Sequence, residues 1–394
     1  MPELIPIRGI RPDASRVNPG DLICPPYDVI PPEDHDRLLA HSPWNSVRWI
    51  LGIDPQKPKG SAEDYRRRGK EVRNWIEEGI LRKEEERSLY SYTFRYRSIE
   101  GSQRSYHCIL GAVRARPWGE GILRHEEIRP RVVDDRQLLL KESAVDTGVV
   151  QLVSDGLDEI LARCGFDQES GEFLYEVKDW AENTHILRKI SDPDLLSRLQ
   201  SALDAVPAVV ADGHHRYTSA MQTSGEDEFP GGGHVLAVIG DLRQPGLSIE
   251  PTHRCINFSG EDPAQSAKGG LDLLVTTLDD GEGESWRVEL ADGTSRDLNT
   301  RLSREKPTLV RRIYDTLIEH GATFRTDTPH DSRVARSLLN EKGEGSLLCM
   351  LPGVSRDEFW GRCLNGEVFP PKTTYFEPKI CTGLVTRLID EEFE

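Results

Sequence analysis

Alternating and periodic apolar positions divide the chain into strands and helices. Residues 87–97 and 104–116 alternate apolar and polar side chains on either side of a polar Gly-Ser turn, which predicts a hairpin. Ser61 and Asp64 form a capping-box pattern ahead of apolar residues at helical spacing, so a helix is predicted from there to about Ile80. Asp192 followed by Pro193 predicts a second helix start, for a helix that runs to about residue 205.

Shorter apolar runs predict further elements. Strands are expected at 4–10, 46–52, 148–155, 171–180, 185–191, 207–211, 234–242, 247–258 and 345–353. Helices are expected at 133–145, 156–165, 307–321, 331–341 and 356–365. The elements follow one another without a regular strand–helix rhythm. This order predicts the α+β class with a mixed sheet core rather than a doubly wound parallel sheet.

The chain of 394 residues is long enough for two or three domains, or for one large domain with insertions. It becomes more polar from Ser259 to about Asn299. We therefore expect a main α+β catalytic and nucleotide-binding region at 1–260 and a C-terminal α+β region at 261–394. The tail of the second region, 368–385, is expected to return to the functional site.

Charge and composition narrow the class of protein. Hydrophobic residues make up 37% of the chain, which is enough for a sizeable core. The 67 acidic residues outnumber the 50 basic ones, giving a formal charge of −17. Such a charge disfavours general binding to nucleic acid or to anionic membranes, although a local basic pocket is compatible with it.

The cysteines and the N-terminus indicate the cellular compartment. Seven cysteines are scattered without a C-x-x-C pair, which argues against a disulfide scaffold or a zinc ribbon and fits a reducing cytoplasm. The N-terminus lacks the charged and apolar regions of a signal peptide. No apolar stretch approaches the roughly 20 residues of a membrane helix. We expect a soluble, cytoplasmic protein.

The stretch ADGHHRYTSAM, from Ala211 to Met221, carries the strongest chemical signal. It has the order strand, glycine turn, helix start, which suits a phosphate because the first backbone N–H groups of a helix are unpaired. Gly213 allows close approach, while the side chains of His214, His215 and Arg216 supply donors.

Asp212 precedes this turn and is a candidate Mg²⁺ ligand or a partner that orients a histidine. A capped turn with surface histidines is an equally good interpretation. A zinc site is disfavoured because adjacent histidines in a turn rarely converge on one ion.

Other short clusters bounded by proline or glycine add candidate residues. Tyr27 and Asp28 lie in a proline-braced turn, and Asp28 is the early carboxylate best held for general-base catalysis. Glu126, next to His125, is a second candidate base. The alternatives are a simple tight turn and a solvated charged loop. Three residues of EPTHR, which ends an apolar strand, are candidate donors to a substrate: Thr252, His253 and Arg254.

The tail segment PPKTTYFEPK contains two lysines in an extended, proline-bounded context. Lys372 and Thr373 are candidate phosphate ligands there, and an edge strand docked by its aromatic residues is the alternative. Together the clusters point to an anionic ligand. The sequence has no Walker, Rossmann or protein-kinase motif, so a nucleotide would need a different cradle.

In this order, the clusters resemble domain-of-unknown-function family 1015. The matching stretches are PPYD, SPWNSVR, HEE with DDRQLLL, ADGHHRY, IEPTHR and PPKTTYFEPKICTGL, and they extend over essentially the whole chain. Within them, Asn45 and Arg48 of SPWNSVR join the candidate substrate-binding residues, as does Tyr27. Two departures are Trp44, where the family tends to have tyrosine, and AVDTGVVQLVSD, where an Asn-Leu-Ser-Pro type of segment is expected.

The DGHHR core is also similar to the nucleotide-phosphate motif of the ParB/sulfiredoxin-like superfamily, in particular to that of free serine kinases. This resemblance implies a ParB/sulfiredoxin-like unit with large insertions that transfers a phosphoryl group from ATP or ADP, with Mg²⁺, to the hydroxyl of free L-serine. It implies phosphate binding at Asp212 to Arg216 and a catalytic set of Asp28, Glu126 and His214.

Two rival functions follow from the same superfamily. One is a ParB-like, nucleotide-dependent DNA-binding or regulatory protein, which the net charge and the absence of a recognisable helix-turn-helix disfavour. The other is a sulfiredoxin-like reductase, which would need a cysteine where the chain has His214. The expected partners are a nucleotide and a small amino acid, with a homodimer as a candidate assembly, and neither a membrane nor nucleic acid.

Overall fold

The computed structural model describes residues 2–54, 56 and 59–391. The chain forms two compact units, Met1–Leu247 with Pro378–Glu394, and Ser248–Glu377. These limits differ from the expected regions 1–260 and 261–394. The strand after residue 253 pairs with later strands of the second unit, which is why that unit begins before residue 260.

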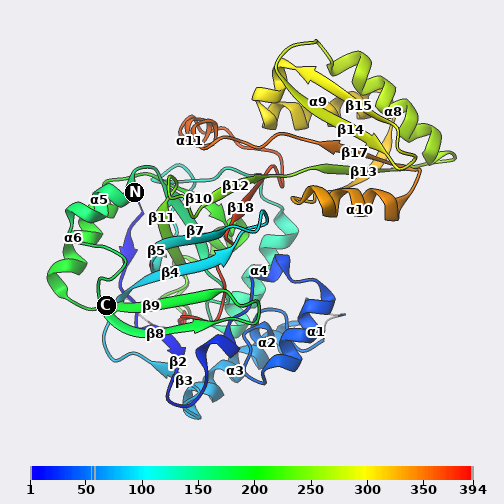
Figure 1. Cartoon of the computed structure of the whole chain (residues 1–394). Helices are drawn as coiled ribbons and strands as arrows, with labels where there is room; N and C mark the ends of the chain where they lie inside the picture. The colour runs from blue at the N-terminus through cyan, green and yellow to red at the C-terminus, as the bar shows by residue number, and fades with distance from the viewer. Residues whose placement is uncertain (1, 55, 57–58, 392–394) are drawn as a thin grey trace. The chain divides into compact units, whose positions relative to one another are not determined.

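A mixed nine-stranded sheet forms the centre of the first unit (Figure 1). Its order is β6-β10-β7-β11-β5-β4-β9-β8, and β1 pairs with β5. The pairs β10–β6 and β11–β7 are parallel, whereas the others are antiparallel. The strands are β1 Leu4–Ile5, β4 Leu89–Arg97, β5 Gln103–Arg114, β6 Ile122–Leu123, β7 Val150–Ser154, β8 Glu172–Lys178, β9 Thr184–Ile190, β10 Ala208–Asp212 and β11 His234–Asp241.

Two apolar cores hold this unit together. Helices α5 (Leu157–Arg163), α6 (Pro193–Leu203) and α7 (His214–Thr223) contribute to a core with one face of the sheet. A second core joins α1 (Pro32–His41), α2 (Val47–Ile50) and α3 (Ala62–Glu77) with the two-stranded sheet of β2 (Ile10–Pro12) and β3 (Leu81–Lys83). The remaining elements are α4, Pro130–Ser143, and the 3₁₀ turns η1, Pro19–Leu22, and η2, Tyr27–Val29.

Several predicted elements of this unit are confirmed, and two are wrong. The single strand predicted at 4–10 is two strands, β1 and β2, which belong to different sheets. The hairpin is β4–β5, and Ser61 with Asp64 forms a complete capping box at the start of α3. Asp192 caps α6 by accepting from the backbone N–H of Leu195 at 2.6 Å. The segment predicted as a strand at 46–52 contains helix α2 instead, since the side chain of Asn45 accepts the N–H of Val47 and begins a helical turn.

The second unit has a five-stranded antiparallel sheet of order β15-β14-β17-β13-β16. Helices α8 (Pro263–Leu278) and α9 (Lys306–Glu319) pack in one core with Ile256 and Leu347, while α10 (Ser332–Lys342) packs with Cys255 and Leu348. Since neighbouring residues of a strand point to opposite faces, the helices cover both faces of this sheet. The strands are β13 Arg254–Ser259, β14 Glu284–Leu290, β15 Ser295–Thr300, β16 Thr323–Asp327 and β17 Ser346–Met350.

A separate two-stranded sheet of the second unit joins β12 (Ser248–Pro251) to β18 (Thr374–Glu377). The strand predicted at 247–258 is therefore two strands, β12 and β13, because the chain turns at Thr252 and His253. The other elements are η3, Arg301–Arg304, and α11, Arg356–Leu364.

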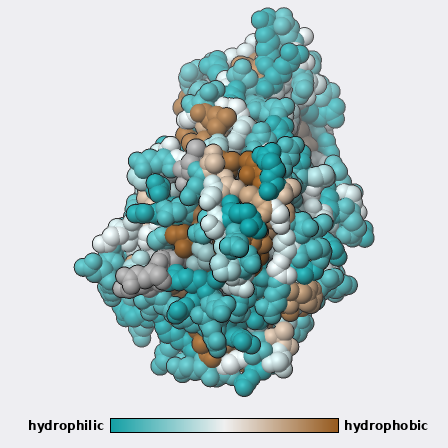
Figure 2. Space-filling model, turned by 90° about the vertical axis from the view of Figure 1, so that its left-hand side faces the viewer, coloured by the Kyte–Doolittle hydropathy of each residue, from teal (hydrophilic) through white to brown (hydrophobic). Residues whose placement is uncertain are grey.

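Both units combine helices with sheets, and the main sheet is mixed, so the predicted α+β class is confirmed. Hydrophilic residues cover most of the surface in Figure 2, and the apolar areas on it are small and separate. Within the described ranges, no helix is both long and apolar enough to span a membrane.

Candidate functional site

The turn between β10 and α7 is built to approach a ligand closely. The pairing of β10 with β7 is irregular between Val210 and Asp212, so the strand bends where it ends. Gly213 has a φ of +95°, a conformation that side chains disfavour, and no side chain caps the helix that begins at His214. The N-terminal backbone N–H groups of α7 therefore carry positive partial charge at an end without a side-chain cap.

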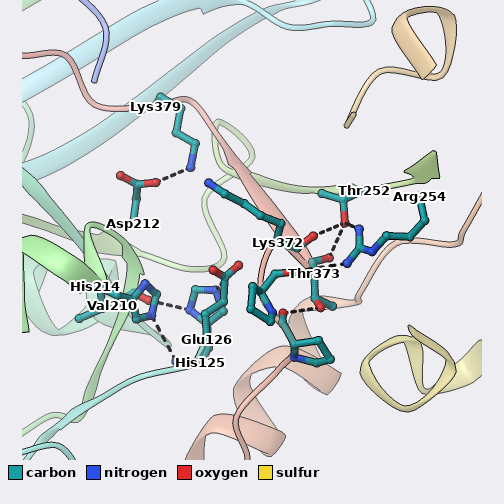
Figure 3. Close-up of polar contacts among 12 residues, drawn as sticks. His125, Glu126, Val210, Asp212, His214, Thr252, Arg254, Lys372, Thr373 and Lys379 are labelled. Atoms are coloured by element: carbon teal, nitrogen blue, oxygen red, sulfur yellow. Dashed lines mark hydrogen bonds and ion pairs between the residues drawn. The ribbon is translucent and has the colours of Figure 1, made fainter. Parts of the chain in front are cut away.

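Asp212 bridges two cations beside this turn. One of its oxygens accepts from Nη2 of Arg216 at 2.8 Å. The other accepts from Nζ of Lys379 at 2.5 Å, as Figure 3 shows. The side chains of all three residues are 10–14% exposed. Both oxygens of Asp212 are thus bound to cations, which is an arrangement different from the Mg²⁺ ligand that the sequence suggested.

Lys379 lies in the segment that returns to the first unit after β18. Burial on its own would lower the pKa of its ammonium group. The carboxylates of Asp212, Asp28 and Glu126 outweigh the burial, and the pKa is raised. Lys379 therefore stays charged, and the same interactions place both predicted base candidates within electrostatic reach of it.

The two candidate bases come from different loops. Asp28 is exposed in the short turn η2, directly after Pro25 and Pro26. Glu126 follows β6, and its side chain is 17% exposed, with Oε1 at 3.8 Å from Nε2 of His125. Asp28 has the greater access to solvent and hence to a substrate.

The ring of Tyr27 lies close to two arginines. The guanidinium carbon of Arg136 is 4.4 Å from the ring centroid and that of Arg216 is 6.0 Å from it. Burial, followed by the charge of Asp28, raises the pKa of the Tyr27 hydroxyl. One aromatic ring of the PPYD turn therefore contacts Arg216 of the DGHHR stretch and Arg136 of α4.

The two histidines of the motif face the loop that carries Glu126. Nε2 of His214 accepts the backbone N–H of His125 at 3.4 Å, and Nε2 of His215 accepts that of Arg129 at 3.2 Å. His214 is buried, and desolvation lowers its pKa to about 3. Such a neutral acceptor fastens a loop, which differs from the catalytic and phosphate-binding roles expected of His214. The two Nε2 atoms also accept from different amides, in agreement with the argument against a zinc site.

The loop of His125 is held from a second direction as well. Nδ1 of His125 donates to the carbonyl of Val210 at 2.7 Å, so the loop is fixed to the end of β10 (Figure 3). Together the three histidines position the loop of Glu126 on the turn that contains Asp212.

Asn45 and Arg48, predicted to bind substrate, lie on either side of the start of α2. Asn45 is fully buried, and its Nδ2 donates to the carbonyls of Asp21 at 2.9 Å and Ile23 at 3.0 Å. Its amide therefore shapes the chain that leads into the PPYD turn. Arg48 is half-buried, and its Nε is a buried donor without a hydrogen-bond partner.

The other predicted site residues lie in the second unit, where they form a buried network. The hydroxyl of Thr252 donates to the carbonyl oxygens of Lys372 at 2.8 Å and Thr373 at 3.0 Å. Nη1 of Arg254 donates to the Thr252 hydroxyl at 3.2 Å, and the Thr373 hydroxyl donates to the carbonyl of Pro370 at 2.7 Å (Figure 3). These polar groups hold together the segments that flank β12 and β18.

Lys372 and His253 complete that region. Lys372 has a φ of +58°, a strained backbone for a residue with a side chain. Nδ1 of His253 accepts the backbone N–H of Leu351 at 3.2 Å, and burial, followed by the charge of Lys306, lowers its pKa to about 4. His253 is hence a neutral, buried acceptor.

Two residues of the site were missed from the sequence. Lys379 stands in the same proline-bounded segment as Lys372, and nothing local marks it as the partner of Asp212. Arg136 belongs to the DDRQLLL stretch, which contributed to the family resemblance without a role being assigned to it. The sequence does not indicate which distant segments the side chains of Lys379 and Arg136 contact.

One further group of potential metal ligands occurs in the described part of the chain. Asp179, His185 and Cys381 are buried with their ligand atoms within 4.8 Å of one another. Asp179 accepts from Nε2 of His185 at 3.1 Å and from the backbone N–H of Ala181 at 2.9 Å, and Nδ1 of His185 is 2.9 Å from the Tyr92 hydroxyl. These hydrogen bonds account for the cluster as a support of the β8–β9 hairpin.

Comparisons with solved structures find similar folds at low sequence identity. SbnI with C-terminal truncation from Staphylococcus aureus is 12% identical, with a TM-score of 0.41, over 71% of this chain and 87% of that one. A conserved hypothetical protein from Pyrococcus furiosus is 15% identical, with a TM-score of 0.39, over 70% and 95%. A free serine kinase in complex with AMP is 13% identical, with a TM-score of 0.40, over 68% and 88%.

The sequence comparisons assign the family. No curated protein matches the chain. A family model does match residues 4–268 of this chain. These residues include the PPYD, HEE and DGHHRY stretches of the candidate site. Because this match extends over more than half of the chain, the protein belongs to the family described as protein of unknown function DUF1015.

Proposed function

We propose that this protein is a small-molecule kinase that transfers a phosphoryl group from ATP or ADP to the hydroxyl of free L-serine. The observation that carries the proposal is the Arg216–Asp212–Lys379 bridge beside the uncapped start of α7. Phosphoryl transfer depends mainly on positioning and charge neutralisation, which such an arrangement of donors supplies.

The phosphate chain would bind where the two cations and the helix start meet. In the free protein Asp212 holds Arg216 and Lys379 in place, so both are positioned before the ligand arrives. A phosphate oxygen then accepts hydrogen bonds from these cations and from the first N–H groups of α7. The glycine at 213 matters here, because a Cβ in that position would lie 3.0 Å from Nη2 of Arg216.

Asp28 is the proposed base, with Glu126 as the alternative. Its carboxylate would accept the proton of the serine hydroxyl while that oxygen bonds to phosphorus and the bond to the nucleotide oxygen breaks. Lys379 and Arg216 would stabilise the charge that develops on the leaving phosphate. His214 has no part in this step, because it stays neutral and accepts a backbone hydrogen bond.

Mg²⁺ is the expected companion of the nucleotide. Carboxylate oxygens are the ligands that this ion prefers, and Asp28 and Glu126 are the carboxylates that would hold it, since both oxygens of Asp212 are bound to Arg216 and Lys379. The chain thus offers a donor set that fits the ion. The ion would neutralise phosphate charge, while the chain's own residues orient the phosphates and remove the proton.

The direct test is product formation. Purified protein is incubated with L-serine, Mg²⁺ and either ATP or ADP, and O-phosphoserine is measured by ³¹P NMR and mass spectrometry. Product with either nucleotide supports the proposal. Absence of product with both, from protein whose folding is verified by circular dichroism, contradicts it.

Nucleotide binding is tested separately by thermal shift. A nucleotide that binds only the folded state raises the melting temperature, and Arg216→Ala should abolish the rise. Arg131→Ala is the matched control, because Arg131 is exposed at the start of α4. An equal shift in wild type and Arg216→Ala would place the nucleotide elsewhere.

A further inference from the structure

Tyr27 and its two arginines extend the cationic site away from the phosphate turn. Arg216 belongs to α7 and Arg136 to α4, yet both guanidinium groups face the same ring, at 6.0 and 4.4 Å. The ring therefore contacts two cationic positions. One of them, at Arg216 and Lys379, is the proposed place of the transferred phosphate.

Over the described ranges, Tyr27, Arg136 and Arg216 have hydrogen-bond donors without a partner. Nε of Arg216 is buried without a hydrogen-bond partner. Nε and Nη2 of Arg136 both donate to the same oxygen of Asp135, at 3.0 and 2.5 Å, and Nη1 has no partner among the residues that the structure describes. The Tyr27 hydroxyl likewise has no hydrogen-bond partner within the described chain. Of these three donors, Nε of Arg216 is the one that is fully buried, and such a donor is rarely left unpaired in proteins. Nη1 of Arg136 and the Tyr27 hydroxyl are available to a ligand that reaches them.

Arg136 is held rigidly for this purpose. Its side chain is 6% exposed, and the other oxygen of Asp135 accepts from the Tyr65 hydroxyl at 2.8 Å. That hydroxyl in turn accepts the backbone N–H of Gly60 at 3.0 Å. The guanidinium is thus fixed by Asp135 from one side and covered by the Tyr27 ring from another. A fixed planar fork is the arrangement that binds carboxylate and phosphate groups most selectively.

We propose that Arg136 and the Tyr27 hydroxyl bind a second oxyanion, which is a carboxylate or phosphate group of the phosphoryl acceptor. This inference rests on the proposed kinase function and names the group of the acceptor that the site recognises. Asp28 directly follows Tyr27, so an acceptor anchored at Arg136 presents its hydroxyl near the proposed base and near the phosphate at Arg216. The substrate is then a hydroxy acid or a hydroxylated phosphate ester rather than a neutral alcohol.

The test compares ligands that differ only in the anionic group. L-Serine is paired with ethanolamine, and glycerate and glycerol 3-phosphate are paired with glycerol. Affinities are measured by isothermal titration with and without saturating ADP, for wild type, Arg136→Met, Arg136→Lys and the exposed control Arg131→Met. We expect the wild type to prefer at least one anionic ligand over its neutral partner by about tenfold or more, since charge-assisted hydrogen bonds are strong.

The variants locate that preference. Arg136→Met should abolish it and leave the dissociation constant of ADP within about twofold of wild type, whereas Arg131→Met should retain it. Arg136→Lys keeps the charge without the fork and should retain part of it. A larger difference in affinity between L-serine and ethanolamine, or between glycerate and glycerol, indicates a carboxylate ligand. A larger difference between glycerol 3-phosphate and glycerol indicates a phosphate ligand.

Three results overturn the inference. These are equal binding of every anionic ligand and its neutral partner by wild type, an unchanged preference in Arg136→Met, and a loss of ADP affinity in Arg136→Met with the preference retained. The last result would assign Arg136 to a phosphate of the nucleotide. Absence of ADP binding would instead contradict the kinase proposal. The two failures are distinguishable because the anionic and neutral ligands are also compared without ADP.

Discussion

The two units each contain an arginine-bearing motif after an apolar strand, and the two arginines have different surroundings. In the first unit Arg216 follows β10 and shares the carboxylate of Asp212 with Lys379. In the second unit Arg254 begins β13 and is fully buried. The sequences DGHHR and PTHR suggest similar ligand sites. The atoms around the two guanidinium groups differ, however, and indicate different roles.

Arg254 acts on its own chain. Its Nη1 donates to the Thr252 hydroxyl at 3.2 Å and to the carbonyl of His253 at 3.0 Å, and Thr252 continues the network to the backbone of Lys372. Within the described residues, Nε of Arg254 is buried without a hydrogen-bond partner, as Nε of Arg216 is, so the difference between the two arginines lies in their charged neighbours. Arg254 donates to uncharged oxygens of its own unit. The counter-charge of Arg216 is shared with Lys379, which positions Arg216 for an additional anion. We therefore expect substitutions in the first region to affect catalysis and binding, and those in the second to affect stability.

The largest expected effect is that of Asp28→Asn. The amide keeps the shape of the side chain and cannot accept a proton, so phosphoryl transfer should fall by about 10²- to 10⁴-fold. The ADP dissociation constant and the melting temperature should stay close to wild type, because Asp28 is exposed in a short turn. The rate is measured by coupled nucleotide turnover. Glu126→Gln is the matched variant, and a larger loss there would make Glu126 the base.

Lys379→Met should weaken nucleotide binding by about 10- to 100-fold, as expected for the loss of a charge-assisted contact to phosphate. Asp212 keeps its contact with Arg216, so the protein should remain folded. Titration of ADP measures the effect, and Lys379→Arg should recover part of it. Lys372 is the lysine that the sequence predicted as a phosphate ligand, and Lys372→Met is the control. If Lys372→Met reduces the affinity for ADP as much as Lys379→Met does, the assignment of the phosphate to Lys379 is wrong.

Local signals predicted much of the fold. The capping box of Ser61 with Asp64 and the β4–β5 hairpin depend on residues close in sequence, and both are confirmed. The helix α8 was missed because Gly269 and Gly270 lower helix propensity. The structure explains one of these glycines, since a Cβ at Gly270 would lie 2.8 Å from Cζ of Phe258. Helix α2 was mistaken for a strand because a short buried apolar run fits either element.

Long-range contacts decided the part of the site that could not be predicted. The roles proposed for Asp212, Arg216, Asp28 and Glu126 come from residue types and turns that suit phosphate and proton chemistry. The roles of His214 and His215 depend on a loop at residues 124–130, which lies far away in the sequence. The choice of Lys379 over Lys372 likewise depends on where the tail re-enters the first unit.

Lys306→Met should stabilise the second unit by about 1 to 3 kcal/mol. Lys306 is fully buried, its Nζ has no hydrogen-bond partner, and such a group is costly to bury. Desolvation, followed by the charge of Arg254, lowers its pKa well below the usual value. Thermal unfolding and hydrogen exchange in α9 measure the change, and the exposed Lys342→Met is the control with an effect within about 0.5 kcal/mol.

The same lysine affects the pH dependence of stability. Between its lowered native pKa and about 10.4, its unfolded value, the unfolded state binds more protons than the native state. Stability of the second unit therefore rises with pH over this window, and Lys306→Met should remove that rise. An unchanged pH dependence, or destabilisation by the methionine, would mean that Lys306 is charged and solvated in the native state.

The smallest effect concerns a property that the two regions share. His214 and His253 are both buried acceptors of a backbone N–H, with pKa values lowered to about 3 and about 4. Below about pH 6.5 the unfolded histidine gains a proton that the native one does not. Stability should thus fall as pH decreases from 6.5, by at most about 1.4 kcal/mol per pH unit for each histidine, down to the native pKa.

His214→Gln and His253→Asn each supply an amide oxygen in place of the accepting nitrogen and remove the titration. Urea unfolding at pH 7.5, 6.0 and 5.0 should show a shallower loss of stability toward acid in each variant. A different result would be that only His253→Asn reduces the loss of stability toward acid. His214 would then become protonated in the native state, and acid would release the loop of Glu126.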